Sequence, residues 1–402
     1  MSSPQRLVRP PRNGAAKQSD PALSGVRILF VLPSLGLGGA ERQALLLARH
    51  LRANLQADVR IVAMSRESGL VEACEAAHIP HAFFDLTHAY RSRLGHLKDL
   101  LRFVLLLRRE RAQIVLPYCM FQNVLCGLTW WTGGASVCIW NQRDEGRARL
   151  EGWIERIAVR TLRRFVSNSR HGAAFLTEHL HVPAEMVSLV ANGVEMPEPG
   201  PSRTNMRDAL GLPPGALVVC MVANLHGKKD HATLLAAWRL VIDRQPEGSP
   251  PPHLLLAGSF GDRHDALVQQ AMALSIEDRV HFLGTVHDVN DLLRSVDLAV
   301  FSSFTEGVPN AVLEAMAHGL PVVGTDFEGI QEAVGPEGAG LLAATRDPEQ
   351  LAERILMTVA DPALRARIGQ RARERAMDVF GVDRMVSEMT GIIAAEWARA
   401  GR

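Results

Sequence analysis

The segment 302–326, SSFTEGVPNAVLEAMAHGLPVVGTD, carries two glutamates, Glu306 and Glu314, with seven residues between them. Glu306 follows a short apolar run that predicts a β-strand, so it belongs to the loop at the C-terminal end of that strand. Asn310 is expected to be the N-cap of a helix that runs to about His318, where a glycine and a proline end it. Glu314 then lies one turn inside the helix.

This arrangement has a chemical use. The first amides of the predicted helix, near Ala311 and Val312, lack partners within the helix and form an anion site that the helix dipole assists. A carboxylate beside an anion site calls for a polar, uncharged group between the two, and a sugar on a diphosphate has that form. Glu306 would face the sugar, and Glu314 could accept both hydroxyls of a ribose. The alternative is an ordinary loop glutamate and an exposed helix glutamate.

Strand-like and helix-like segments alternate along the rest of the chain, which predicts parallel sheets covered by helices on both faces. Ligands of such doubly wound sheets bind outside the carboxyl ends of the strands, so two facing sheets would enclose a cleft. The predicted strands are residues 26–33, 58–65, 79–86, 113–118, 135–140 and 164–169 in the first half, and 217–224, 253–258, 280–284, 298–303 and 321–326 in the second.

The length of 402 residues predicts two domains, and a segment rich in Pro and Gly at 192–202 is expected to link them. The domains are predicted at 25–197 and 203–375. Residues 376–402 are expected to form a C-terminal helix that crosses back to the first domain. Residues 1–24, rich in Pro, Ser and Arg, are predicted to be a disordered tail without a signal peptide.

Composition excludes several classes of function. A net charge of +1 gives no field for nucleic acid. Five cysteines without a C-x-x-C pair argue against a metal site or a disulfide framework and favour a reducing cytoplasm. The apolar segment 114–140 is interrupted by polar residues, so no transmembrane span is expected. A dinucleotide-binding G-x-G-x-x-G motif fails, because its last position is Glu41.

The segment EGVPNAVLEAMAHGLPVV resembles the E-x7-E signature of the retaining glycosyltransferase family 4. This resemblance implies an α/β fold of the GT-B class, in which two doubly wound Rossmann-like domains face each other across a cleft. It extends over residues 26–375. The other segments that carry it are LGLGGAER (35–42), VSNS (166–169), VANGVE (190–195), VANLHGKKDHATLLAA (222–237) and VHFLGTVHDVNDLLRSVDLAVFSS (280–303).

The resemblance assigns roles to individual residues. Glu306 would contact the hydroxyls of the donor sugar, and Lys229 would neutralise the diphosphate, unless the adjacent Lys228 does so. The donor-binding residues would be Glu314, Asn310, Ala311, Val312, Asn224, Gly307, Gly38 and Gly39. Arg143, Asp144 and Glu41 are candidates for acceptor contacts, although Arg143 and Asp144 could equally form a structural ion pair and Glu41 could equally cap a helix.

Two positions depart from the family pattern. Asn224 stands where the family usually has an arginine, and Glu328 replaces one of two glycines, with Gly329 retained. These departures keep open a non-catalytic protein of the GT-B fold. A different GT-B enzyme, such as a nucleotide-sugar epimerase or a phosphorylase, is the other alternative.

The expected function is transfer of a sugar, with retention of configuration, from a nucleoside-diphosphate sugar to a glycan or a lipid-linked sugar in surface polysaccharide biosynthesis. UDP is the expected base. No cofactor and no metal are expected, because no D-x-D signature occurs where one is needed. The basic, amphipathic segment 91–113 would place the enzyme at the inner face of the cell membrane, or is an ordinary helix packed on the sheet.

Overall fold

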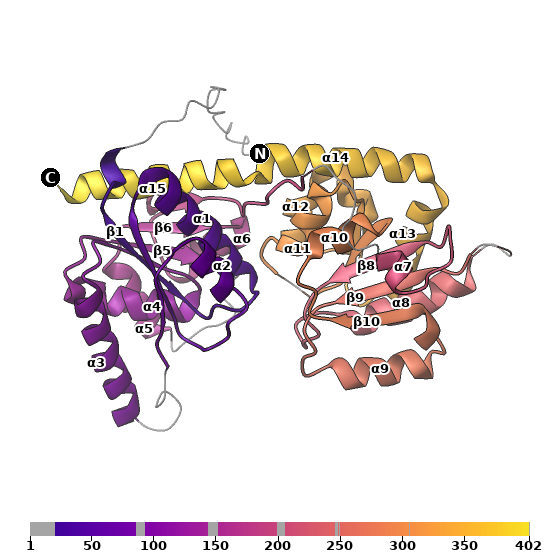
Figure 1. Ribbon diagram of the computed structural model, residues 1–402, viewed down its shortest axis with the longest axis horizontal. Coiled ribbons are helices and arrows are strands. Elements are labelled where there is room, and N and C mark those ends of the chain that lie inside the picture. Colours follow the sequence, from indigo (N-terminus) through magenta and orange to yellow (C-terminus); the bar gives the residue numbers. More distant parts are fainter. Residues whose placement is uncertain are drawn as a thin grey trace.

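The computed structural model describes residues 21–85, 93–143, 152–198, 206–245, 248, 250–304 and 306–401. Figure 1 shows two α/β domains side by side, with the last two helices running end to end along one edge of both. Residues 1–20 of the predicted tail lie outside the described residues. Residues Pro21–Leu23, however, form a 3-10 turn, and Leu23 is completely buried, so the prediction of a tail is wrong for these residues.

The N-terminal domain contains a sheet of seven parallel strands in the order β3-β2-β1-β4-β5-β6-β7. Ile28 pairs with Val59 on one side and with Ile114 on the other, which fixes the register of the central strands. The strand β7 was not predicted, since three half-exposed residues carry little apolar signal. The strands are β1 Arg27–Leu32, β2 Asp58–Ala63, β3 His81–Phe83, β4 Ile114–Pro117, β5 Val137–Gln142, β6 Arg164–Ser167 and β7 Val187–Leu189.

Helices cover both faces of this sheet and create two apolar cores, one around Phe30 and Leu51 and the other around Phe103 and Trp140. The α-helices are α1 Gly39–Leu55, α2 Val71–Ala76, α3 Arg93–Glu110, α4 Met120–Thr129, α5 Trp153–Arg160 and α6 Arg170–Ala174. A π-helical turn, Phe175–His179, continues α6, and 3-10 turns lie at Trp130–Gly133 and Ala184–Met186.

The C-terminal domain repeats the design with six parallel strands in the order β10-β9-β8-β11-β12-β13. The two-residue strand β13 was not predicted. The strands are β8 Val218–Val222, β9 His253–Ala257, β10 Val280–Gly284, β11 Leu298–Phe301, β12 Val322–Thr325 and β13 Leu342–Ala343. The helices are α7 Met206–Ala209, α8 His231–Asp243, α9 His264–Ala273, α10 Val289–Arg294, α11 Asn310–Ala317, α12 Glu328–Gly338, α13 Pro348–Ala360 and α14 Pro362–Phe380, with 3-10 turns at Glu277–Arg279 and Ala339–Leu341.

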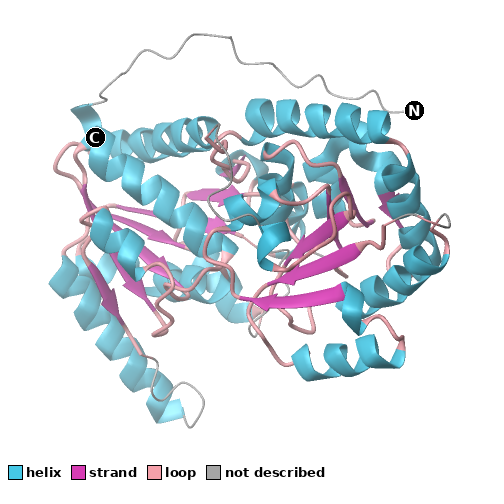
Figure 2. Ribbon diagram, turned by 45° about the vertical axis from the view of Figure 1, so that its right-hand side comes forward, coloured by secondary structure: helices cyan, strands magenta, loops and turns pink. Residues whose placement is uncertain are grey.

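The last helix, α15 (Val382–Ala400), packs on the N-terminal domain, as Figure 2 also shows. Its Met389 and Ile393 are buried in the core around Phe30, and Glu396 pairs with Arg164 on β6 at 2.9 Å. The expected boundary at residue 376 is wrong, because it falls inside α14. The chain crosses between the domains at Gly381, which separates α14 from α15.

The order of strands reverses between β1 and β4 in one sheet and between β8 and β11 in the other. The loops that follow these strands at their carboxyl ends are where ligands of doubly wound sheets bind.

The segment predicted as a linker begins differently from expectation: Asn192 is buried rather than exposed. None of the described helices combines the length and apolarity needed to cross a bilayer.

Candidate functional site

A cavity of about 480 Å³ lies between the two domains at the reversal points of both sheets. The N-terminal domain contributes the loop after β1 and the first turn of α1. The C-terminal domain contributes the loops after β8, β9 and β11 together with the start of α11. The lining includes Gly38, Gly39, Arg42, Asn224, Lys228, Lys229, Glu306, Asn310, Ala311 and Glu314. The structure therefore brings most of the predicted donor residues to one cavity.

The start of α11 differs from the prediction in its capping. Pro309 is the N-cap, and Asn310 is the first helical residue, with no capping hydrogen bond from the N-cap side chain. Asn310 is therefore not an N-cap. The side-chain Nδ2 of Asn310 instead donates to the carbonyl of Gly39 at 3.0 Å, and its Oδ1 accepts from Asn192 Nδ2 at 2.8 Å. This side chain joins α11 to the N-terminal domain.

The anion site at this helix is smaller than predicted. The amides of Val312 and Leu313 both donate to the carbonyl of Pro309, so Val312 does not offer a free donor. Among the described residues, the amides of Asn310 and Ala311 have no backbone acceptor in the loops and turns. These two amides, at the positive end of the helix dipole, are the donors left for an anion.

Lys229 and Glu306 form an ion pair inside the cavity. Both side chains are largely buried, and the Lys229 ammonium also lies 4.6 Å from the centre of the Phe301 ring. Lys229 is placed by an antiparallel bridge to Ser303, which links the loop after β8 to the loop after β11. Lys229 faces Glu306, whereas the adjacent Lys228 is exposed, so the geometry favours Lys229 as the lysine beside the donor.

Glu314 is the most buried acid of the cavity, with 14% of its side chain exposed. Its Oε1 lies 2.8 Å from Nη1 of Arg42, which reaches across from α1. Burial raises the pKa of this carboxyl, and the nearby Arg42 guanidinium opposes that rise. Arg42 was not predicted to contact Glu314. No sequence pattern reports a pair whose members lie on different domains.

Asn224, at the position of the family's arginine, lines the cavity but is held by the protein. Its Oδ1 accepts a hydrogen bond from the amide of Ser259 at 3.0 Å, which braces the loop after β9. The neighbouring Lys228 also lines the cavity. The cavity thus contains two lysine side chains close to the position that lacks the arginine.

The glycine loop of the N-terminal domain approaches α11 closely. A Cβ added to Gly39 would lie 3.0 Å from Asn310 Nδ2. Glu41 folds back under this loop: its carboxylate would clash with a Cβ on Gly38, and Oε1 lies 3.4 Å from Ser34 Oγ. Burial raises the pKa of Glu41. Glu41 was expected either to contact an acceptor or to cap a helix; the structure places it in the first turn of α1, against the glycine loop, with Gly38 as the N-cap.

Asp144 lies outside the described residues. Arg143, its neighbour, stacks its guanidinium 4.8 Å above the ring of Tyr118 and donates to Asn192 Oδ1 at 3.2 Å. Asn192 also receives a hydrogen bond from Asn168 and donates to the carbonyl of Val308. Asn192, which was predicted to begin a linker, is thus buried and hydrogen-bonded to residues of both domains.

Glu306 and Gly307 are backed by the first turn of α12. A Cβ added to Gly329 would lie 2.0 Å from the carbonyl oxygen of Gly307 and 2.4 Å from that of Glu306, so only glycine allows this approach. Glu328, the residue that replaces a family glycine, points elsewhere: its carboxylate forms a hydrogen bond with Nδ1 of His171 on α6, across the cleft. The added carboxylate therefore engages the opposite domain.

Two family models cover this chain. "Glycosyl transferases group 1" matches residues 202–375, and "Glycosyltransferase Family 4" matches residues 37–196. A D-inositol 3-phosphate glycosyltransferase from Salinispora arenicola is 29% identical over 272 residues, which cover 64% of this chain and 60% of that protein. An N-acetyl-alpha-D-glucosaminyl L-malate synthase from Bacillus anthracis is 36% identical over 135 residues, 34% of this chain and 35% of that protein. The chain thus matches less than two thirds of the length of these curated relatives.

Solved structures share the fold across its whole length. Anabaena HepE in complex with UDP-glucose has a TM-score of 0.78 at 22% identity, covering 92% of this chain and 99% of that chain. WaaG, a glycosyltransferase involved in lipopolysaccharide biosynthesis, has a TM-score of 0.68 at 19% identity, covering 90% and 100%. The two facing parallel-sheet domains are accordingly a GT-B fold. With both domains matched by their family models, the chain belongs to glycosyltransferase family 4.

Proposed function

We propose that this protein is a retaining glycosyltransferase that moves a sugar from a nucleoside-diphosphate sugar, with UDP as the base, to a glycan or lipid-linked sugar acceptor in surface polysaccharide biosynthesis. One observation carries the donor assignment: a single cavity between the domains contains the Lys229–Glu306 pair, the free amides at the start of α11 and the buried Glu314. We propose UDP as the nucleotide because HepE, which shares the fold, has been solved in complex with UDP and with UDP-glucose.

The chemistry follows from the charges in the cavity. The bond from the anomeric carbon to the diphosphate oxygen breaks as the diphosphate gathers negative charge, and Lys229 together with the amides of Asn310 and Ala311 would stabilise that charge. These fixed positive groups are the reason to propose that the enzyme needs no divalent metal. Glu314 would accept the ribose hydroxyls in its ionised form.

Retention of configuration is proposed to occur by substitution on one face of the sugar. Glu306 is an unsuitable nucleophile, since its carboxylate is paired with the Lys229 ammonium. The departing diphosphate oxygen would instead accept the proton of the acceptor hydroxyl while that hydroxyl attacks the anomeric carbon from the same side. Glu306 would hold the sugar hydroxyls during this step.

A membrane site for the reaction is proposed from α3. Three leucines spaced four residues apart, Leu97, Leu101 and Leu105, are 52%, 55% and 62% exposed and therefore form a stripe along one face. The opposite face buries Phe103 and Leu107. Exposed basic residues flank the stripe: Lys98, Arg108 and Arg109. Figure 1 shows α3 at the outer edge of the N-terminal domain, where this stripe could rest on an anionic bilayer at the cytoplasmic face.

Turnover of the donor tests the proposal directly. The purified protein is incubated with UDP-glucose, UDP-galactose and UDP-N-acetylglucosamine together with total lipid-linked glycan extract, and UDP release is followed with and without EDTA. We expect release with one donor, insensitivity to EDTA, and a product whose new linkage keeps the α configuration of the donor by NMR. Nucleotide binding without release from any donor would favour a non-catalytic member of the family.

A further inference from the structure

A second interdomain cavity, of about 1010 Å³, lies on the other side of Glu306 from the donor cavity. The N-terminal domain lines it with α6 and the π-helical turn, and the C-terminal domain lines it with α12 and the loop after β12. Glu306 is the one described residue that belongs to both linings. A sugar bound at Glu306 would therefore lie at the boundary between the two cavities.

The boundary is built tightly. The backbone of Gly329 packs directly against the carbonyls of Glu306 and Gly307, which fixes the position of the loop. The side chain of Asn168 lies on the other side of that loop, and a Cβ added to Gly307 would be 3.7 Å from its terminal atoms. Asn168 is 4% exposed, and its Oδ1 has no hydrogen-bond partner among the described residues. This buried acceptor lies against Gly307 and belongs to the lining of neither cavity.

The lining of this second cavity is acidic. Five carboxylates face two guanidinium groups and two imidazoles. The acidic residues are Glu178, Glu306, Asp326, Glu328 and Glu332, the arginines are Arg170 and Arg375, and the histidines are His171 and His179. Glu306 is already paired with Lys229, so with neutral histidines the other four carboxylates against the two guanidinium groups leave an excess of two negative charges.

One of the two arginines of the lining, Arg375, is already engaged, and the other, Arg170, is exposed. Arg375 donates to the carbonyls of Ala333 and Glu332 at 2.7 and 2.8 Å. His171 pairs with Glu328. Arg170 is exposed, and its backbone amide donates to Glu332 at 3.1 Å. The Arg375 fork is therefore not free to receive a phosphate or a carboxylate, and the remaining arginine, Arg170, meets the cavity from an exposed position.

We propose that this cavity holds the receiving sugar of the acceptor and that this sugar is neutral or carries an amino group, without phosphate or carboxylate. The inference rests on the proposed glycosyl transfer and adds the acceptor's chemistry to it. Carboxylates accept hydrogen bonds from sugar hydroxyls and attract an ammonium group, whereas they repel a phosphate. A lipid-linked diphosphate satisfies this condition as long as the receiving sugar itself bears no anion.

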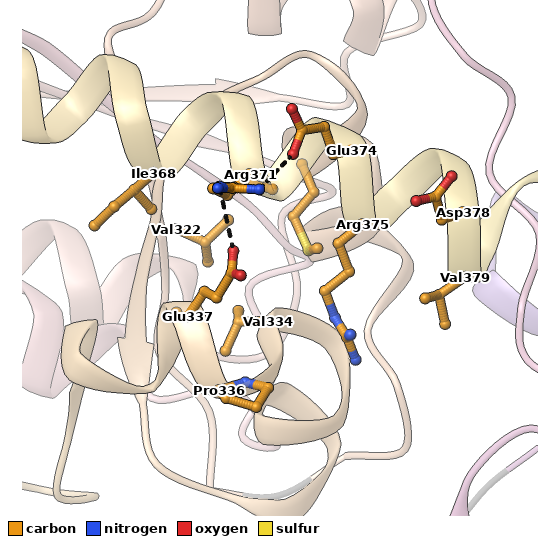
Figure 3. Close-up of a pocket in the computed structure, with 13 residues that line it drawn as sticks. Val322, Val334, Pro336, Glu337, Ile368, Arg371, Glu374, Arg375, Asp378 and Val379 are labelled. Carbon is orange, nitrogen blue, oxygen red and sulfur yellow. Dashed lines mark hydrogen bonds and ion pairs between the residues drawn. The ribbon is translucent and has the colours of Figure 1, made fainter.

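A third cavity, of about 340 Å³, does not compete for this role. It lies behind α12, against α14, and Figure 3 shows that Arg371 in its lining pairs with Glu337 and Glu374. Glu306 does not line it. Glu337 nevertheless provides a matched control, since it lies on the same helix as Glu328 and Glu332 but lines only this third cavity.

The test compares two probes that differ by one phosphate, glucosamine and glucosamine 6-phosphate. Their binding to the full-length protein, saturated with UDP, is measured by saturation-transfer NMR titration at pH 7. We expect glucosamine to bind at least tenfold more tightly than its phosphate. In the double variant Glu328→Gln/Glu332→Gln the ratio should fall on the order of three- to tenfold, because two carboxylates are neutralised. Glu337→Gln should keep the wild-type ratio.

Equal or tighter binding of glucosamine 6-phosphate, binding of neither sugar, or an unchanged ratio in the double variant would overturn the proposal. The variants' UDP affinity is measured in the same samples. Wild-type UDP binding together with any of these outcomes refutes the acceptor assignment alone. Absence of UDP binding in the wild-type protein would instead refute the proposed donor site.

Discussion

Arg42 on α1 and Glu314 on α11 meet across the interdomain cleft, with 2.8 Å between Nη1 and Oε1. The pair ties the N-terminal domain to the carboxyl that the account assigns to the donor ribose. Since burial raises the pKa of Glu314 and Arg42 counteracts this, the arginine keeps the carboxyl ionised at a lower pH than burial alone would allow.

Replacement of Arg42 should therefore alter the pH dependence of nucleotide binding. In Arg42→Ala the pKa of Glu314 rises further, so the ionised, ribose-accepting form is lost at a higher pH. UDP affinity, measured by calorimetry from pH 5 to 8, should show its acid limb displaced to higher pH. Arg49→Ala, about two turns further along α1, serves as the control. Identical acid limbs in Arg42→Ala and wild type would show that Arg42 does not govern Glu314.

Lys229→Met should lower kcat by ~10²–10³-fold, because the leaving diphosphate loses a cation positioned in a partly buried site. UDP binding should weaken less than turnover, since charge on the diphosphate grows in the transition state. Lys228→Met, the adjacent and exposed lysine, should change kcat little. Steady-state rates of UDP release are measured for both variants. A larger loss of kcat in Lys228→Met than in Lys229→Met would show that Lys228, not Lys229, stabilises the diphosphate.

Gly329→Ala tests the support of the Glu306 loop. The new Cβ would lie 2.0 Å from the carbonyl oxygen of Gly307, so the loop must move. We expect destabilisation of about 1–3 kcal/mol, as for other forced overpacking, together with loss of turnover. Gly340→Ala, where a Cβ would meet nothing within 4 Å, is the matched control. Chemical denaturation of both variants measures the free energy of unfolding, and equal values would argue against the close approach.

His231, buried at the first residue of α8, should make the fold sensitive to acid. Burial, aided by Lys229, lowers its pKa from 6.5 to about 4. The unfolded chain then binds more protons between these values, so this stability is fully present above pH 6.5 and is lost as the pH falls toward 4. The loss amounts to ~3 kcal/mol at the acid end of that window.

Urea unfolding at pH 7 and pH 4.5 measures that loss. In His231→Leu the free energy of unfolding should differ less between the two pH values than it does in the wild type. His181→Asn, which changes an exposed histidine, should retain the wild-type difference. If His231→Leu lost as much free energy of unfolding between pH 7 and pH 4.5 as the wild type, other groups would be the cause of the acid sensitivity.

The leucine stripe of α3 should be required for vesicle binding but not for folding. Leu101→Glu/Leu105→Glu places two charges at positions that are 55% and 62% exposed, so the melting temperature should change little. Co-sedimentation with vesicles containing anionic phosphatidylglycerol should fall at least tenfold. Met272→Glu, an exposed apolar residue on α9 of the other domain, should bind as the wild type does. Undiminished binding of the leucine variant would refute the membrane surface.

Sequence reasoning predicted the fold because its evidence is local and repeated. Eleven of the strands follow from short apolar runs bounded by polar turns, whereas β7 and β13, with three and two residues, are too short to give a pattern. The E-x7-E segment placed Glu306 and Glu314 correctly on either side of a helix start. Its cap was assigned to Asn310 because asparagine usually fills that role, and the structure uses Pro309 instead, since Asn310 is engaged with the other domain.

The contacts between domains could not be predicted from the sequence. Arg42 with Glu314, Asn192 with Asn310, and His171 with Glu328 each join residues more than a hundred positions apart. Nothing in the local pattern of either partner reports such a pair. The buried position of Asn192 was missed for the same reason, since Gly and Pro just after it have the composition of a flexible linker.

The binding of nucleoside diphosphates tests the central claim most directly. The melting temperature of the wild-type protein and of Glu314→Ala is measured with UDP, GDP, ADP and NAD, each with and without EDTA. At about 100 times its dissociation constant a ligand adds about 2.7 kcal/mol, which a melt resolves. The account predicts a shift with UDP that EDTA does not alter and that Glu314→Ala abolishes. A shift with NAD alone, with none of the four ligands, or with UDP only when a metal is present would contradict it.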